Sequence, residues 1–157
     1  MTRIIVIGSK GQLGNEFQAI ARNFPGSEFF FYDKDELDIQ VKEDVGIKLA
    51  ELKPQFLINC AAYTAVDKAE TDKEIAFTIN SEAVGFMAAA CRLNNTRFIH
   101  ISTDYVFDGT ASSPYKEDDD TNPTSVYGET KLEGEREALR NDPEAIIIRT
   151  AWVYSAY

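Results

Sequence analysis

Short apolar runs alternate with longer segments of helical periodicity along this chain. Five of the runs are continuous and rich in β-branched or aromatic residues, a composition typical of strands buried on both faces of a sheet. They span residues 3–7, 28–32, 55–59, 97–102 and 145–149, and apolar residues recur at helical spacing over 12–23, 41–52, 65–95 and 125–139. This alternation predicts an α/β fold with a doubly wound, Rossmann-like parallel sheet, right-handed crossovers and the strand order 3-2-1-4-5.

Length and composition indicate one domain over residues 1–157, because a chain with 44% apolar and 27% charged residues can bury a core. No apolar run reaches the roughly 18 residues of a membrane span, and residues 1–8 enter a strand without the design of a signal peptide. We therefore expect a cytoplasmic protein. The formal net charge of -10 argues against nucleic acid or an anionic membrane as a partner, but it leaves room for a local phosphate site.

The two cysteines and the single histidine do not suggest metal binding. Cys60 and Cys91 have no partners at metal-ligand spacing, so we expect reduced, buried thiols and no metal. His100 lies inside the run 97–102, where a core histidine is a better interpretation than a ligand or a general base. A histidine-based triad is not expected.

A loop with three glycines follows the first apolar run and opens the first helical segment. Gly8, Gly11 and Gly14 are spaced Gly-x-x-Gly-x-x-Gly rather than Gly-x-Gly-x-x-Gly, so the dinucleotide fingerprint is matched in context only. Glycines at such a turn allow a tight reversal and let a pyrophosphate approach the backbone at a helix N-terminus. We interpret the loop as a nucleotide-binding turn; the alternative is a purely structural one.

Further candidates for nucleotide binding follow the next two strands. Asp33, about twenty residues past the last glycine, could hold ribose hydroxyls and favour NAD, whereas Lys34 could accept a 2′-phosphate, so NADH and NADPH both stay open. A solvated turn is the simpler alternative. Asp38 is explained equally by an N-cap or by an adenine pocket. Ala61 and Ala62 follow the third strand, where small residues let a ligand lie close to the backbone.

A hydroxyl, a phenol and an ammonium are expected at the same sheet edge. Thr103 follows the fourth strand, and Tyr127 and Lys131 are four residues apart on the next helix, hence on one face. Thr103 can orient a carbonyl oxygen, Tyr127 can protonate it, and Lys131 can lower the pKa of the tyrosine. Alone, the Tyr-x-x-x-Lys pair is explained as well by a half-buried aromatic and a solvated lysine.

These motifs in this order resemble the extended short-chain dehydrogenase/reductase superfamily and, within it, the dTDP-4-dehydrorhamnose reductases. The similarity covers nearly the whole chain. The segments that carry it are residues 11–14, 37–39, 59–70, 102–109, 127–131 and 149–154.

The resemblance implies reduction of the 4-keto group of a nucleotide-bound 6-deoxyhexose, dTDP-4-dehydro-6-deoxy-L-mannose, to dTDP-L-rhamnose with NADPH or NADH. It implies that the cofactor contacts the glycine loop, the adenine side and the middle of the groove through Gly11, Gln12, Leu13, Asp38, Ile39, Ala62, Tyr63, Thr64, Tyr127 and Lys131. It places Thr103, Asp104 and Trp152 beside the sugar nucleotide, although residue type alone predicts buried packing for Trp152.

The resemblance also leaves alternatives open. Sugar-nucleotide dehydratases of the superfamily carry Asp-Glu after the threonine, and this chain has Asp104-Tyr105, which argues against elimination. Epimerases are excluded less firmly, and a non-catalytic regulatory subunit is a further possibility. Family members continue into a substrate-binding lobe that we expect to be missing here. An exposed sheet edge could promote self-association, so a homodimer stays open.

Overall fold

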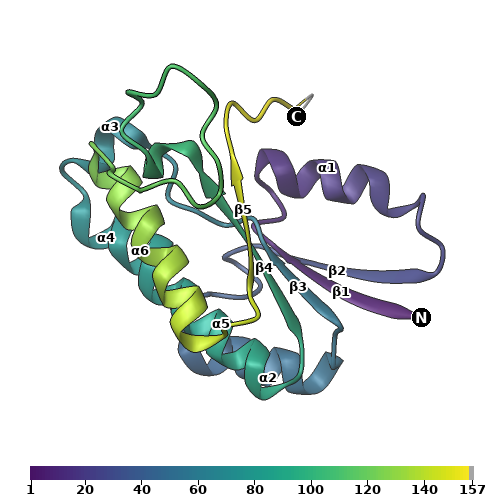
Figure 1. The fold of residues 1–157 in the computed structure, drawn as a ribbon. Coiled ribbons are helices and arrows are strands. Elements are labelled where there is room, and N and C mark those ends of the chain that lie inside the picture. The colour runs from purple at the N-terminus through teal and green to yellow at the C-terminus, as the bar shows by residue number, and fades with distance from the viewer. Residues whose placement is uncertain (156–157) are drawn as a thin grey trace.

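The computed structural model describes residues 1–155 and shows a parallel sheet with helices packed against it (Figure 1). The strands are β1 (Thr2–Ile7), β2 (Ser27–Tyr32), β3 (Phe56–Asn59), β4 (Arg97–Thr103) and β5 (Ile146–Thr150). The helices are α1 (Gln12–Ala21), α2 (Lys42–Leu52), α3 (Val66–Ala69), α4 (Lys73–Phe77), α5 (Ala83–Leu93) and α6 (Val126–Asn141). Every predicted strand is present within a few residues of its expected bounds, and the predicted doubly wound parallel fold is confirmed.

The predicted strand order is wrong. The sheet runs β2-β1-β3-β4-β5, so β3 lies between β1 and β4 rather than at the edge. Ile5 of β1 pairs with Phe30 of β2 on one side and with Leu57 of β3 on the other. Three of the four residues of β3 are buried, whereas none of β2 is fully buried. The central position of β3 buries its faces and pairs both of its edges. The alternation of strands and helices along the sequence does not indicate which strand takes the central position.

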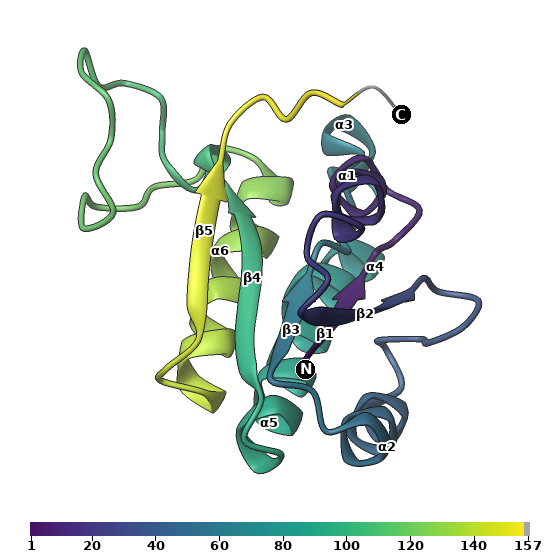
Figure 2. The ribbon, with the colours of Figure 1, turned by 90° about the vertical axis from the view of Figure 1, so that its right-hand side faces the viewer.

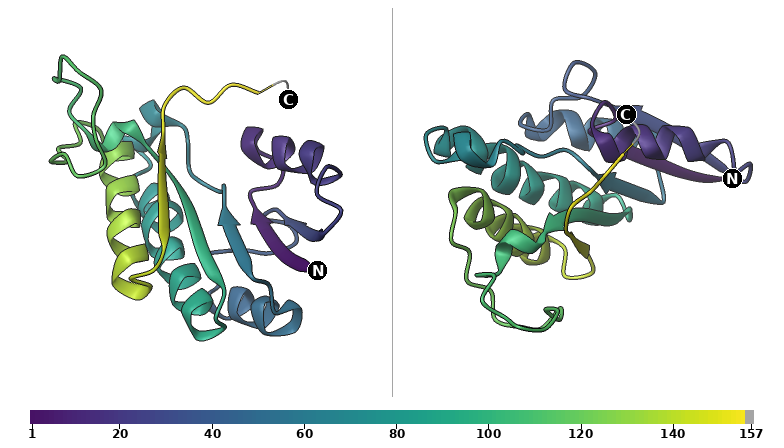
Figure 3. Two further views of the ribbon diagram at one scale, coloured as in Figure 1. Left: turned by 45° about the vertical axis from the view of Figure 1, so that its right-hand side comes forward. Right: turned by 90° about the horizontal axis from the view of Figure 1, so that it is seen from above.

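The direction of winding changes between β1 and β3, and this places helices on both faces of the sheet. The chain steps from β1 outward to β2 and then back across to β3, β4 and β5. Right-handed crossovers therefore put α1 on one face and α2, α5 and α6 on the other. Views from further directions show α5 and α6 side by side and α1 well separated from them (Figures 2 and 3).

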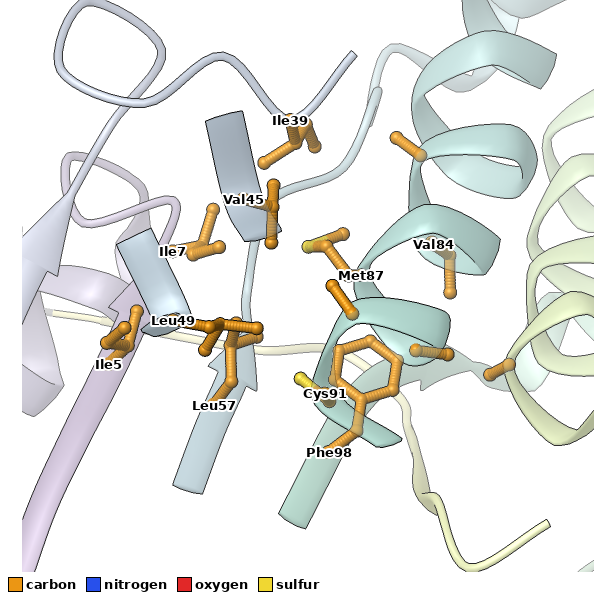
Figure 4. Packing of buried hydrophobic residues seen from close by; sticks show 14 of the residues in the cluster. Ile5, Ile7, Ile39, Val45, Leu49, Leu57, Val84, Met87, Cys91 and Phe98 are labelled. Carbon is orange, nitrogen blue, oxygen red and sulfur yellow. The ribbon is translucent and has the colours of Figure 1, made fainter. Parts of the chain in front are cut away.

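The main core lies between the sheet and the layer formed by α2 and α5 (Figure 4). Ile5, Leu49, Leu57 and Phe98 have no exposed surface, and Met87 of α5 fills the space between them. Each such side chain contributes roughly 1.5–3 kcal/mol when it is removed from water. The core fixes the five strands in register and so aligns their carboxyl ends along one edge.

The segment over residues 65–95, predicted to be mainly helical, consists of several helical pieces. After α3 and α4, residues Thr78–Glu82 form a π-helical turn before α5 begins. The side chain of Asn80 in this turn is buried and bonds to both backbone groups of Tyr63, accepting from its N (2.8 Å) and donating to its O (3.1 Å). The wider turn thus directs an amide side chain at the loop after β3, which periodicity alone could not predict.

Helix starts were predicted with mixed success. Ser125, predicted as the first residue of a helical segment, is the N-cap of α6, and its Oγ accepts a hydrogen bond from the backbone N of Gly128 (3.1 Å). The N-cap of α2 is Val41, so the N-cap interpretation of Asp38 is wrong. Asp38 instead accepts from the backbone N of Gln40 (3.0 Å), closing a local turn.

Two surface properties bear on the remaining predictions. Within residues 1–155, no helix is both long and apolar enough to cross a bilayer. The edge strand β5 leaves Ile146 and Ile148 each 43% exposed. A homodimer stays a prediction.

Candidate functional site

The carboxyl ends of the strands meet at a cleft of about 840 Å³. Its lining combines residues that are up to about 145 positions apart in the chain, because parallel strands deliver their following loops to one edge. Sequence-predicted residues in the lining are Gly8, Gly11, Gln12, Leu13, Asp33, Lys34, Asp38, Ile39, Ala61, Ala62, Thr64, Thr103, Asp104, Tyr127, Lys131 and Trp152.

The glycine loop is built by close backbone contacts. Gly8 has φ +78°, and a Cβ on it would lie 2.6 Å from the backbone N of Ala61. A Cβ on Gly14 would lie 2.2 Å from the carbonyl oxygen of Gly8. These glycines let the turn between β1 and α1 fold onto itself and against the loop after β3. Gly14 is buried and does not line the cleft, so its role is packing rather than contact with a ligand.

The N-terminus of α1 faces the cleft. Gly11 is its N-cap, no side chain of the described residues caps it, and its first turn holds no acidic residue. Free backbone N–H groups at a helix N-terminus form an anion site. On Gly11 a Cβ would contact only the Gly8 carbonyl oxygen at 3.3 Å, so its absence leaves the loop surface open toward the cleft.

Asp33 ties the end of β2 to the glycine loop. One carboxylate oxygen accepts from the backbone N of Lys10 (3.0 Å) and the other from the backbone N of Lys34 (2.8 Å). Lys10 in turn pairs its Nζ with Asp35 (3.0 Å) on the surface. The sequence did not indicate Lys10, which lines the cleft beside Lys34. The cleft therefore has one carboxylate and two lysines at the end of β2.

The loop after β3 divides between the cleft and the interior. Ala61, Ala62 and Thr64 line the cleft, whereas Tyr63 does not. Tyr63 donates from its hydroxyl to Asp72 (2.8 Å) and packs in a small cluster with Tyr127. The resemblance placed Tyr63 at the cofactor; the structure assigns its side chain to the scaffold.

Thr103 and Tyr127 bring two hydroxyl groups together. Thr103 is 7% exposed at the end of β4, and its Oγ1 donates to Asp104 (3.1 Å). Burial raises the pKa of Tyr127, and a hydrogen bond with Thr103 partly opposes that rise. Lys131 is not among the groups that shift this pKa, so the predicted lowering by Lys131 is not seen in this arrangement.

Lys131 is almost completely buried and turns its Nζ to the sheet. Its Nζ donates to the carbonyl oxygen of Ile101 (2.7 Å) and lies 3.3 Å from Nε2 of His100. Burial lowers the pKa of Lys131 to about 8, although nearby Glu135 raises it. His100 is fully buried as predicted, and its contact with Lys131 was not expected.

Two aromatic residues differ from their sequence interpretation. Trp152 is 80% exposed at the cleft with φ +50°, so the prediction of buried packing is wrong and its position beside the cleft agrees with the resemblance. Tyr105 was used only to argue against a dehydratase, yet it lines the cleft and makes an edge contact with Tyr127 at 5.6 Å between ring centroids. Its place two residues after Thr103 was the signal that could have identified it.

The thiols are both free. Cys91 is buried as predicted, whereas Cys60 is only partly buried and lines the cleft. Burial raises the pKa of the Cys60 thiol to about 12, which keeps it protonated and unreactive.

The sequence model of the family described as RmlD substrate binding domain matches residues 1–157. The chain belongs to this family. A dTDP-4-dehydrorhamnose reductase of Aggregatibacter actinomycetemcomitans is 41% identical over 157 residues, which are 100% of this chain and 53% of the relative. A probable dTDP-4,6-dihydroxy-2-methyloxan-3-one 4-ketoreductase of Streptomyces antibioticus is 42% identical over 154 residues, 97% of this chain and 52% of the relative.

Solved structures of family members share the fold. The dTDP-4-dehydrorhamnose reductase of Bacillus anthracis, solved in complex with NADP, has a TM-score of 0.95 and 35% identity over 100% of this chain and 56% of that chain. The chain thus spans about half the length of the relatives it matches. The fold is that of the family's solved structures.

Proposed function

We propose that residues 1–157 are the dinucleotide-binding domain of an NAD(P)H-dependent reductase. Its substrate is a dTDP-linked 4-keto sugar, dTDP-4-dehydro-6-deoxy-L-mannose, and its product is dTDP-L-rhamnose. The observation that carries the proposal is the convergence of Thr103, Tyr127 and Lys131, from β4 and α6, on the cleft that holds the glycine loop. Relatives named dTDP-4-dehydrorhamnose reductase at about 40% identity support the choice of substrate.

The residues of the cleft fit a dinucleotide. The Gly11 surface is open, the N-terminus of α1 is uncapped within the described chain, and small side chains follow β3. NADPH and NADH are both proposed, since Asp33 and Lys34 lie together at the ribose position. The proposed cofactor residues are Gly8, Gly11, Gln12, Leu13, Asp33, Asp38, Ile39, Ala61, Ala62, Thr64, Tyr127 and Lys131, with Gly14 and Tyr63 supporting them.

The side chains then divide the work of carbonyl reduction. A bound dihydronicotinamide supplies the hydride that the carbonyl carbon receives. Tyr127 gives its hydroxyl proton to the carbonyl oxygen, and Thr103 holds that oxygen through its own hydroxyl. A tyrosine is ordinarily protonated near neutral pH, and burial raises the pKa of Tyr127 further, so its hydroxyl holds the proton that the reaction needs. Asp104 and Trp152 are proposed to contact the sugar nucleotide at the open side of the cleft.

The test uses the protein that the gene encodes and the substitution Tyr127→Phe. We expect NADPH oxidation with dTDP-4-dehydro-6-deoxy-L-mannose to fall about 10²–10⁴-fold, the usual contribution of a general acid, while NADPH affinity stays within a few-fold. Tyr115→Phe, which changes a tyrosine outside the cleft, is the matched control. Unchanged turnover in Tyr127→Phe would overturn the proposed role. Turnover with only a different 4-keto sugar nucleotide would change the substrate assignment. No turnover with any 4-keto sugar nucleotide, together with tight binding of a partner enzyme, would favour a regulatory subunit.

A further inference from the structure

Behind the cleft, a buried row of polar groups joins the loop after β3 to Lys131. Asn59 and His100 pair across β3 and β4, and neither has exposed surface. Their side chains lie between the backbone N–H of Ala61 and Nζ of Lys131. The reductase chemistry described above uses neither Asn59 nor His100.

The direction of each hydrogen bond in this row follows from the first donor. The backbone N–H of Ala61 can only donate, and it lies 3.0 Å from the Asn59 side chain, so the atom that faces it is Oδ1. Nδ2 of Asn59 must then face Nδ1 of His100, at 3.0 Å. An amide nitrogen can only donate, so Nδ1 of His100 accepts and the ring proton is on Nε2.

In the last contact of the row, an ammonium on Lys131 would place two donors against each other. Nε2–H of His100 points at Nζ of Lys131 from 3.3 Å, and Nζ already donates to the Ile101 carbonyl oxygen at 2.7 Å. An uncharged amine has a lone pair that accepts from Nε2–H, whereas an ammonium has only donors. Charging Lys131 therefore requires His100 to move its proton to Nδ1, and this breaks the bond from Asn59.

We infer that Asn59 and His100 are positioning residues that disfavour the ammonium form of Lys131. They link the charge of Lys131 to the hydrogen bond that holds the backbone of Ala61. Ala61 packs against Gly8 of the glycine loop, so the row connects the dinucleotide cleft with the lysine. Only the consequence for catalysis rests on the proposed function: an uncharged amine on α6, one turn from Tyr127, can accept a proton and return it. The hydrogen-bond row stands independently of that function.

The other groups near Lys131 do not explain this preference. Glu135 of α6 and the Cys60 thiol after β3 both favour the ammonium, and Tyr127 lies one turn away on α6. His100 is the titratable group contributed by β4, and burial together with Lys131 lowers its pKa well below 6.5, so it stays a neutral ring with one movable proton. Burial and the direction of the row act together against the charge on Lys131.

The single histidine of the sequence makes the test direct. The chain is labelled with ¹⁵N-histidine and with lysine carrying ¹³C at Cε, and NMR spectra are recorded from pH 6 to pH 9.5. We expect the Nε2–H tautomer at pH 9.5, and a change of tautomer with the same midpoint as Lys131. The Nδ1–H tautomer at pH 9.5, or a tautomer that stays constant while Lys131 titrates, overturns the inference.

A substitution provides the second test. Asn59→Leu has a similar volume and removes the donor that fixes the ring, so His100 becomes free to accept from an ammonium. We expect the Lys131 midpoint to rise by at least one pH unit, tenfold in the equilibrium, whereas Cys60→Ser, which changes a neighbour outside the row, shifts it by less. An unchanged midpoint in folded Asn59→Leu contradicts the inference. If Asn59→Leu does not fold, the His100 tautomer measured in the wild type tests the inference. Both readouts are independent of turnover.

Discussion

The amide of Asn80 donates a hydrogen bond to the hydroxyl of Thr130 (3.0 Å), and this hydroxyl donates to the carbonyl oxygen of Tyr127 (2.8 Å). The π-helical turn is thereby attached to the helix that carries the proposed proton donor. Because Asn80 also bonds both backbone groups of Tyr63, it holds the loop after β3 and α6 in one arrangement. Asn80 and Thr130 are both buried, so these bonds are shielded from water.

This link predicts unequal effects of two substitutions. Thr130→Val removes one hydroxyl of a buried pair and is expected to cost about 1 kcal/mol of unfolding free energy. Asn80→Leu also leaves the N–H and carbonyl of Tyr63 without partners, and about 2–4 kcal/mol is expected. Urea unfolding of both variants and of the double variant measures the coupling. Equal costs for the two single variants would show that the Tyr63 bonds contribute little.

Two helical glycines predict opposite outcomes for the same substitution. Gly14→Ala in α1 places a Cβ 2.2 Å from the carbonyl oxygen of Gly8 in the glycine loop, so we expect a loss of about 2 kcal/mol or more, with weaker binding of NADPH. Gly46→Ala in α2 meets nothing within 4 Å and is expected to gain up to about 1 kcal/mol from helix propensity. Thermal unfolding and cofactor titration of the two variants check this. A neutral Gly14→Ala would show that the loop can shift at little cost.

Lys131 predicts a pH-dependent part of stability. Its pKa is about 8 in the folded chain against 10.5 ordinarily, so between these values the unfolded chain holds the extra proton and stability rises with pH. Below pH 8 both states are charged and the full cost of burying the ammonium is present. We therefore expect the stability of Lys131→Met relative to the wild type to be greatest below pH 8 and to decline above it, by up to about 1.4 kcal/mol per pH unit. Urea unfolding at pH 7.5 and 9.5 measures this difference, and a difference independent of pH would contradict it.

The ion pair between α6 and β5, in which the carboxylate is buried, predicts a large loss of stability for a single substitution and a smaller loss for the double substitution. Arg149 donates to both oxygens of Glu135 (2.9 and 2.7 Å), which is 4% exposed and also accepts from Ser102. Arg149→Met leaves a buried carboxylate without its cation and should cost about 3–5 kcal/mol.

Two further variants serve as controls for this pair. Adding Glu135→Met to Arg149→Met should recover much of the loss, since neither charge is then left alone. Arg136→Met, which breaks an exposed pair with Glu133, should change stability by at most about 1 kcal/mol. Equal effects of the buried and the exposed substitutions would contradict the assignment.

The sequence by itself determined the elements and most of the cleft. Short, continuous apolar runs rich in β-branched and aromatic residues favour strands, and parallel strands must deliver Gly11, Ala61 and Thr103 to one edge. The four-residue spacing of Tyr127 and Lys131 fixed their common helix face. These inferences depend on local chemistry and on rules that hold for any parallel sheet, so they required no knowledge of which strands are neighbours.

The tertiary structure decided the strand order, the partners of Lys131 and the exposure of Trp152. Each depends on contacts between residues far apart in the chain, and alternation of elements does not encode them. His100 was correctly predicted as buried, but only the pairing of β3 with β4 placed Asn59 on one side of its ring and the packing of α6 placed Lys131 on the other. Hydrogen-bond direction is a property of such an assembled row, because each donor fixes the next acceptor in space.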